Sequence, residues 1–230
     1  NTSASHFFEK YVNEMKSLRQ FLKLAQFGLD RATDHVESEK LIHKLLTRDS
    51  GISQAVLDPM LASEDIQAFA QKQKKDGFPY LQRLAVVRVW SILEAVVDES
   101  IAHILSQVPW SQLPAAAKAI KGPIVEFLEA DEEARNDFLL DSLKQGVRAS
   151  LKRGVGRFEA LLEAVGFGGK VETLVGRTIL ELSEVRHAIV HRMGLADAKF
   201  ISRCPWVTVL NKEPIPIEAR HVRCYLAAAN

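Results

Sequence analysis

Apolar residues recur at steps of three and four residues through almost the whole chain, which is the spacing of amphipathic helices. Proline and glycine interrupt this pattern and so mark where helices begin and end. The longest uninterrupted pattern follows Pro79 and runs from Tyr80 to about Gln107, so we expect it to be the central core helix. Other helices are predicted at residues 6–29, 32–47, 63–75, 123–129, 132–152, 157–165, 170–193 and 216–228, with a short Ala-rich helix between 110 and 122.

Only the tail departs from the helical period. The segment Trp206–Leu210, bounded by prolines, has β character and predicts a small hairpin or an extended crossing. The pattern therefore predicts an all-α fold with two parts. Residues 78–230 form an up-and-down helical bundle with a short irregular or β-hairpin tail segment, and residues 1–77 form an N-terminal helical extension. The extension either packs onto the bundle as a helical hairpin or forms a separate arm for a partner.

Composition is that of an ordinary folded domain. The 230 residues are 47% hydrophobic and 26% charged, enough to bury a core without metal or disulfide staples. Because 30 basic and 29 acidic side chains nearly cancel, any RNA-binding surface must be a local patch. Cys204 and Cys224 lack metal-ligand spacing and are expected to be reduced thiols. With no membrane-length apolar run and no signal-peptide pattern, we expect a cytoplasmic location.

Candidate chemistry gathers near the end of the predicted helix 170–193. His187 and His191 are four residues apart and share one side of the helix, and Arg186 precedes them. The apolar residues of this helix form one stripe along it. At about 100° per residue, Arg186 lies about 60° from the middle of that stripe. A guanidinium keeps its charge, so this position requires an acidic neighbour, a phosphate or a cleft. The histidines lie nearly opposite the stripe and face solvent or another subunit.

The position of the two histidines suits proton transfer. Both lie in the last two turns before Gly194, where the helix dipole favours imidazolium. The alternative is a pair of ordinary surface histidines, whereas a zinc site lacks a third and a fourth ligand. On the helix beginning at Tyr80, Glu94 lies inside the apolar arc, and we hypothesise that it orients Arg186. A purely structural ion pair is the alternative role for Glu94.

The segment Arg186-His-Ala-Ile-Val-His191 resembles the R-polar-x3-H signature of the HEPN superfamily. Its surroundings, residues 182–194, are similar to the last core helix of that family. The segment Val89-Trp-Ser-Ile-Leu-Glu94 is similar to the earlier helix that carries an acidic residue. The resemblance covers residues 78 to about 228 and leaves residues 1–77 uncovered.

The resemblance implies a HEPN-like bundle that forms a homodimer, with two such motifs facing one cleft. Active members cut RNA without metal or another cofactor, using the 2′-hydroxyl as nucleophile and leaving a cyclic phosphate. Carried over, His191 is the acid–base residue, Arg186 holds the scissile phosphate and His187 supports one or both. Because about 140° separates Arg186 from His191 on an ideal helix, a two-fold cleft suits them better than one chain.

A basic stretch is predicted to grip the RNA backbone beside the cleft, together with Arg192. The alternative is a solvated helix face. Its members are Lys144, Arg148, Lys152, Arg153 and Arg157.

Three functions follow from these patterns. The first is a HEPN endoribonuclease of toxin–antitoxin or antiviral systems, with an antitoxin or defence-system partner protein. The second is a non-catalytic HEPN module that binds nucleotide or protein through the same cleft. The third is a helical scaffold whose N-terminal arm performs the recognition.

Overall fold

The chain is all-helical in the part that the structure describes. The computed structural model describes residues 2–46, 58–149 and 152–230, with side chains described except those of residues 2–8, 32–46, 58–65, 67 and 124. No strand occurs among these residues, which confirms the predicted all-α class.

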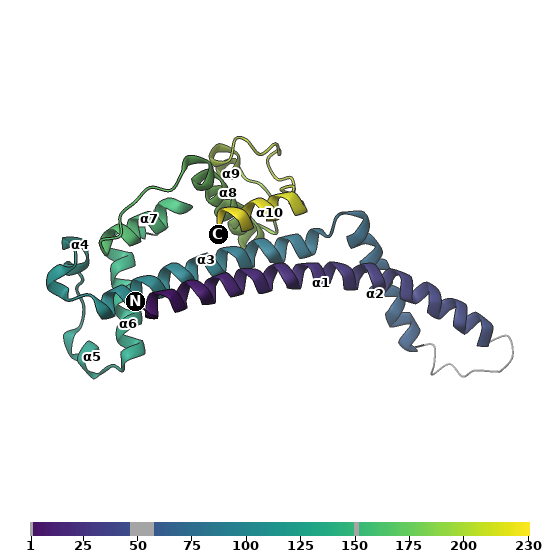
Figure 1. Cartoon of the computed structure of the whole chain (residues 1–230). Coiled ribbons are helices and arrows are strands. Elements are labelled where there is room, and N and C mark those ends of the chain that lie inside the picture. The colour runs from purple at the N-terminus through teal and green to yellow at the C-terminus, as the bar shows by residue number, and fades with distance from the viewer. Residues whose placement is uncertain (1, 47–57, 150–151) are drawn as a thin grey trace.

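A long antiparallel helix pair forms the base of the molecule. Helix α1 (Thr2–Leu46) runs alongside α2 (Asp58–Lys75) and α3 (Pro79–Gln107), as Figure 1 shows. The prediction of two helices within residues 6–47 was wrong, because a lone glycine at Gly28 costs only about 1 kcal/mol in a helix and does not end it. The predicted start at Ser63 was also wrong, since α2 begins at Asp58 with proline in its first turn.

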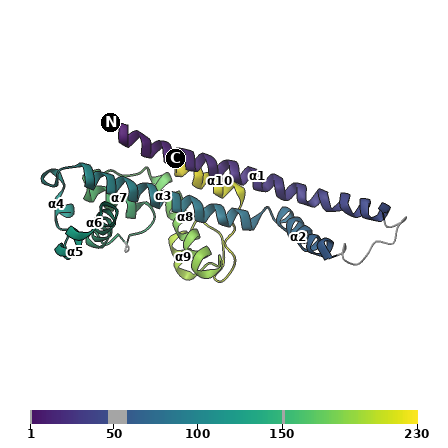
Figure 2. The same ribbon diagram turned by 90° about the horizontal axis from the view of Figure 1, so that it is seen from below.

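Helix α3 is the central element, and both its ends were predicted. Gly77 and Phe78 take left-handed conformations, with φ of 75° and 61°, and turn the chain from α2 into Pro79. The Tyr80 amide donates to Gln73 Oε1 at 3.0 Å and ties the start of α3 to the end of α2. Figure 2 shows α3 lying between α1 on one side and, on the other, α8 (Thr173–Arg192) with α9 (Ala198–Arg203).

Two apolar clusters pack along α3. The first, near its start, includes Val86 and Val89 of α3 with Leu182 and Val185 of the later helix α8. The second, near its end, surrounds Ile101 and contains residues of α6 and α7. Helix α3 thus contributes to both clusters. The buried apolar residues of α8, the helix that carries the segment from Arg186 to His191, belong to the first cluster.

The first half of α1 packs into the first cluster. Met15 and Leu18 are buried there, with 1% and 8% of their surfaces exposed. Tyr11 Oη donates to the Ala229 carbonyl, and Arg19 donates to the Leu226 carbonyl at 3.2 Å. This part of the predicted extension therefore shares a core with the bundle, and a domain boundary at residue 77 stays a prediction.

Short helices cap the far end of α3. They are η2 (Trp110–Gln112), α4 (Ala115–Lys118), α5 (Ile124–Glu129), α6 (Glu132–Gly146) and α7 (Val155–Ala164). Asp131 caps α6 by accepting from the Ala134 amide at 2.8 Å. Helix α6 ends at Gly146 rather than at the predicted Lys152, because Gly146 is a weak helix former and Arg148 adopts a left-handed φ of 50°.

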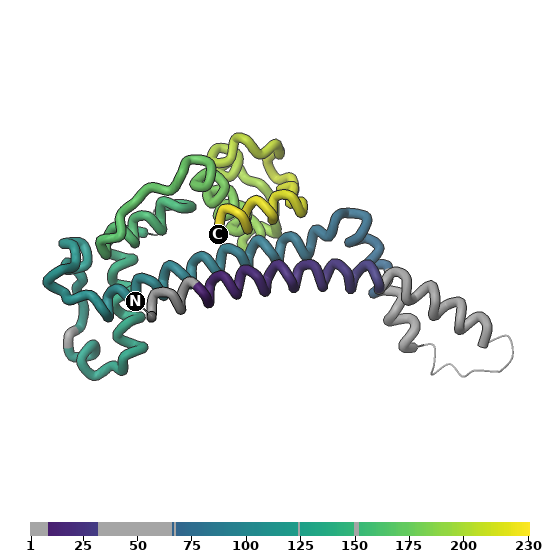
Figure 3. The backbone as a smooth tube through the Cα atoms, in the orientation of Figure 1, coloured from purple at the N-terminus to yellow at the C-terminus, as the bar shows by residue number. Residues whose placement is uncertain are grey.

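The C-terminal part folds back over α3. Helix α8 (Thr173–Arg192) is followed by α9 (Ala198–Arg203) and, after a long loop, by α10 (Ala219–Ala228), a path that Figure 3 traces. Residues 206–210 form no strand, so the hairpin alternative was wrong and the irregular alternative for this tail segment is confirmed. Extended pairing in the described residues is one antiparallel bridge, Leu195 with Pro214, where the segment between α8 and α9 meets the loop that precedes α10.

Candidate functional site

The motif residues occupy the last two turns of α8. The helix ends in a left-handed turn at Met193 and Gly194, with φ of 56° and 82°, so the left-handed end predicted at Gly194 begins one residue earlier. The Gly194 amide donates to the Ala188 carbonyl at 2.9 Å. His191 is exposed and His187 is partly exposed, and their ring centroids are 4.6 Å apart. The two imidazoles therefore contact each other at the surface.

The pKa of His187 lies below its ordinary value. Removal from water is the largest cause, and the positive charges of Arg192 and His191 act in the same direction. Glu184 raises the pKa of His187 and Arg153 lowers it, so the cations outweigh the one carboxylate. The prediction that the helix end favours imidazolium was therefore wrong for His187. The lowered pKa of His187 favours its neutral imidazole, which is able to accept a proton.

Arg186 has no acidic partner in the described part of the chain. Its guanidinium forms no hydrogen bond or ion pair there, and its Nε is buried without a hydrogen-bond partner. Glu94, the predicted partner, accepts instead from Arg157 Nη1 at 2.7 Å. The expected Glu94–Arg186 pair was wrong because a third helix, α7, supplies the cation that reaches Glu94. Arg186 thus carries a positive charge that no described carboxylate balances.

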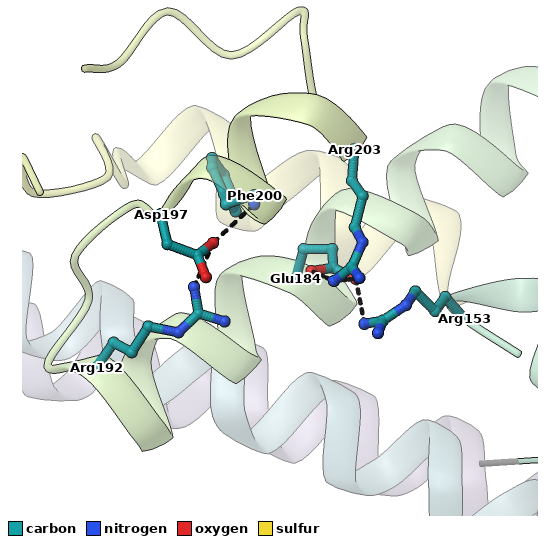
Figure 4. A network of polar contacts seen from close by, with 6 residues as sticks. All are labelled: Arg153, Glu184, Arg192, Asp197, Phe200 and Arg203. Carbon is teal, nitrogen blue, oxygen red and sulfur yellow. Dashed lines mark hydrogen bonds and ion pairs between the residues drawn. The ribbon is translucent and has the colours of Figure 1, made fainter. Parts of the chain in front are cut away.

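A buried carboxylate lies two residues before Arg186. The Glu184 side chain is only 2% exposed. It accepts from Arg153 Nη1 at 3.1 Å and from Arg203 Nη1 at 3.0 Å, and Figure 4 shows both guanidiniums on it. Arg153 precedes α7 and Arg203 ends α9, so Glu184 ties both elements to α8.

This cluster was not predicted, because the apolar periodicity of residues 170–193 indicates a single buried face. The face that carries Glu184 also carries Ala188, which is completely buried. A small residue one turn after an acid was the available signal, since small side chains allow a neighbouring element to approach closely.

A second acidic residue of α8 anchors the tail. Glu181 accepts from Trp206 Nε1 and, at 2.7 Å, from Tyr225 Oη. The guanidinium of Arg177 stacks on the Trp206 ring, 4.1 Å from its centroid. Burial, followed by the charge of Glu181, raises the pKa of Tyr225. Side-chain bonds rather than strand pairing thus hold the segment around Trp206.

The predicted basic stretch is not a uniform RNA-binding surface. Arg148 and Lys152 are exposed and form no ion pair with described residues. The remaining predicted cations bind carboxylates of the chain itself, in the pairs Lys144–Asp98, Arg153–Glu184, Arg157–Glu94 and Arg192–Asp197. These pairs were not foreseen because their acids lie on other elements or beyond the end of α8.

Helix α3 contributes one further cation to the end of α8. The Arg83 guanidinium packs on Gly194, with its Cζ 3.4 Å from where a Cβ on that glycine would lie. Arg83 forms no ion pair with described residues and is partly buried. Arg83, which packs on Gly194, and Arg186, in the last two turns of α8, are thus two cations near this helix end that no described carboxylate pairs with.

Apolar side chains surround the same helix end. Val190, Met193 and Leu195 are 48%, 79% and 37% exposed. Apolar side chains this exposed, at the helix end that carries the two histidines, are suited to burial against another protein surface.

No metal site is apparent in the described residues, where no three His, Cys, Asp or Glu side chains gather suitably. Similarly, none of the helices in the described ranges has the length and apolar character to cross a membrane. Comparison of the chain with protein-family models, curated proteins and solved structures gives no match. The roles of the α8 residues therefore rest on their geometry and on the motif.

Proposed function

We propose that this protein is a metal-independent endoribonuclease of the HEPN type, acting as a homodimer. The observation that carries the proposal is the contact between His187 and His191 at the surface end of α8, the helix that also carries Arg186, which no described carboxylate pairs with. Two imidazoles and a guanidinium are the groups that phosphodiester cleavage through a 2′-hydroxyl requires.

The proposed reaction moves two protons and exchanges one bond at phosphorus. A neutral imidazole accepts the proton of the 2′-hydroxyl, whose oxygen then bonds to phosphorus. The bond from phosphorus to the 5′-oxygen breaks, and an imidazolium protonates that leaving oxygen. The products are a 2′,3′-cyclic phosphate and a 5′-hydroxyl. Arg186 neutralises the charge that develops on the phosphoryl oxygens.

Two histidines in contact suit these opposite roles. The 4.6 Å separation of the two ring centroids disfavours two positive charges at once, which fits one ring accepting a proton and the other delivering one. The lowered pKa of His187 supports its role as proton acceptor. His191, more exposed and nearer the helix end, is the acid–base residue that delivers the proton to the leaving group.

Two observations support the proposed homodimer, namely the angles on α8 and the exposed apolar side chains at its end. Arg186 and His191 diverge by about 140° on a helix, so one phosphate reaches both more easily when they come from different chains. Val190, Met193 and Leu195 would then be buried where two α8 ends meet.

The decisive experiment incubates purified protein with total RNA in EDTA and analyses the ends formed. Wild type is expected to leave cyclic phosphates, and Arg186→Ala and His191→Ala are expected to leave the RNA intact. His103→Ala is the control, since it lies about 30 Å along α3 from Arg83. RNA that stays intact with wild type, or equal cleavage by wild type and both variants, would overturn the proposal. Light scattering that gives a monomer would overturn the shared cleft.

A further inference from the structure

The Glu184 cluster carries more positive than negative charge. One buried carboxylate binds two guanidiniums, from Arg153 and Arg203, so the three side chains sum to about +1. A single arginine would already neutralise Glu184. The second arginine therefore adds a positive charge that no carboxylate in the described residues balances.

Arg153 is the accessible member of this cluster. Its side chain is 48% exposed, compared with 25% for Arg203 and 2% for Glu184. One of its terminal nitrogens is bound to Glu184, and a guanidinium has further N–H donors in a rigid plane. The buried carboxylate therefore holds the Arg153 fork in a fixed orientation, which lowers the entropy lost when it binds an anion.

The cluster lies beside the histidine pair. Glu184 precedes His187 by three residues, so both occupy the same side of α8. Both Glu184 and Arg153 lie close enough to His187 to act on its charge. An anion held by Arg153 would thus lie next to the proposed reaction centre.

We propose that Arg153, oriented by Glu184 and backed by Arg203, binds an RNA backbone phosphate that neighbours the scissile one. This assignment rests on the proposed ribonuclease function and adds a substrate-positioning site to it. The ligand chemistry is a phosphodiester on a single strand, since a guanidinium fork matches two phosphate oxygens.

The chain offers a matched control for Arg153. Arg88 on α3 is similarly exposed, at 54%, and also binds one glutamate, Glu14, at 2.6 Å. In that pair, however, one carboxylate balances one guanidinium, and Glu14 is itself 47% exposed. Arg88→Gln therefore removes an equivalent surface charge without removing the excess charge of the Glu184 cluster.

The test measures binding of a fluorescent single-stranded RNA whose 2′-hydroxyls are methylated, so that it cannot be cleaved. Anisotropy titrations across a range of KCl concentrations give the slope of log Kd against log salt. Each phosphate contact to a single strand contributes about 0.7 to that slope. Arg153→Gln is expected to lower the slope by about 0.7 and weaken binding several-fold. Arg153→Lys is expected to keep the slope, and Arg88→Gln to match wild type.

The outcomes separate the two proposals. If wild type cleaves unmodified RNA while Arg153→Gln keeps the wild-type slope and affinity, the phosphate assignment is refuted and the ribonuclease proposal survives. If wild type neither binds nor cleaves RNA, both fail. Competition by inorganic phosphate that is equal for wild type and Arg153→Gln would also refute the assignment. A purely structural role would lower the unfolding midpoint of Arg153→Gln without changing the slope.

Discussion

Replacing Gly154 by alanine tests the packing that places Arg153 beside Glu184. Gly154 precedes α7 with φ of 51° and ψ of −135°, a conformation that side chains with a Cβ strongly disfavour. A Cβ there would lie 2.7 Å from the Cα of Leu180, on α8, and 3.1 Å from its backbone nitrogen. These are backbone atoms of a packed helix, so the clash cannot be relieved by rotating a side chain.

The cost has two parts. Holding alanine in this backbone conformation costs about 1–3 kcal/mol. Forcing extra atoms into a close-packed contact costs about 1–3 kcal/mol more. Gly154→Ala is therefore expected to lower the free energy of unfolding by about 2–6 kcal/mol, a large share of the roughly 5–15 kcal/mol typical of a folded domain.

Urea denaturation followed by circular dichroism measures this change. Gly156→Ala is the matched control two residues later, where an added Cβ meets nothing within 4 Å and φ is not left-handed. Inside α7, that change is expected to stabilise the protein by up to about 1 kcal/mol. A Gly154→Ala protein within about 0.5 kcal/mol of wild type would show that α7 does not approach the α8 backbone as described.

Three further predictions concern titration, hydrogen bonding and thiol reactivity. Because the folded protein lowers the pKa of His187, the unfolded chain binds more protons near pH 6, so acidification through that range should weaken folding. His187→Gln should flatten this pH dependence of the urea midpoint, and an unchanged dependence would contradict the assignment. Tyr225→Phe removes the bond to Glu181 and should cost about 1.5–3 kcal/mol in chemical denaturation, and no loss would contradict that bond. Burial raises the pKa of Cys204 to about 12, so iodoacetamide should label exposed Cys224 and spare Cys204 until urea unfolds the chain; equal native labelling would refute this.

Local signals along the chain determined several features of this protein. Proline and apolar spacing set both ends of α3, Pro79 and Gln107, because these signals act on the backbone within one or two turns. The placement of His187 and His191 at the end of α8 followed from counting residues on a helix. The continuity of α1 was misjudged, because tertiary packing stabilises a helix across a weak position such as Gly28.

The tertiary structure alone decided which charged groups meet. A helical count gave the side of α3 on which Glu94 lies, yet Arg157 of α7 reaches it rather than Arg186. Glu184 was not singled out from the sequence, and the fold brings Arg153, which precedes α7, and Arg203, which ends α9, onto its buried carboxylate. Periodicity gives the direction of a side chain from its own helix axis. The partner of a charge depends on where loops carry other elements, which no local pattern encodes.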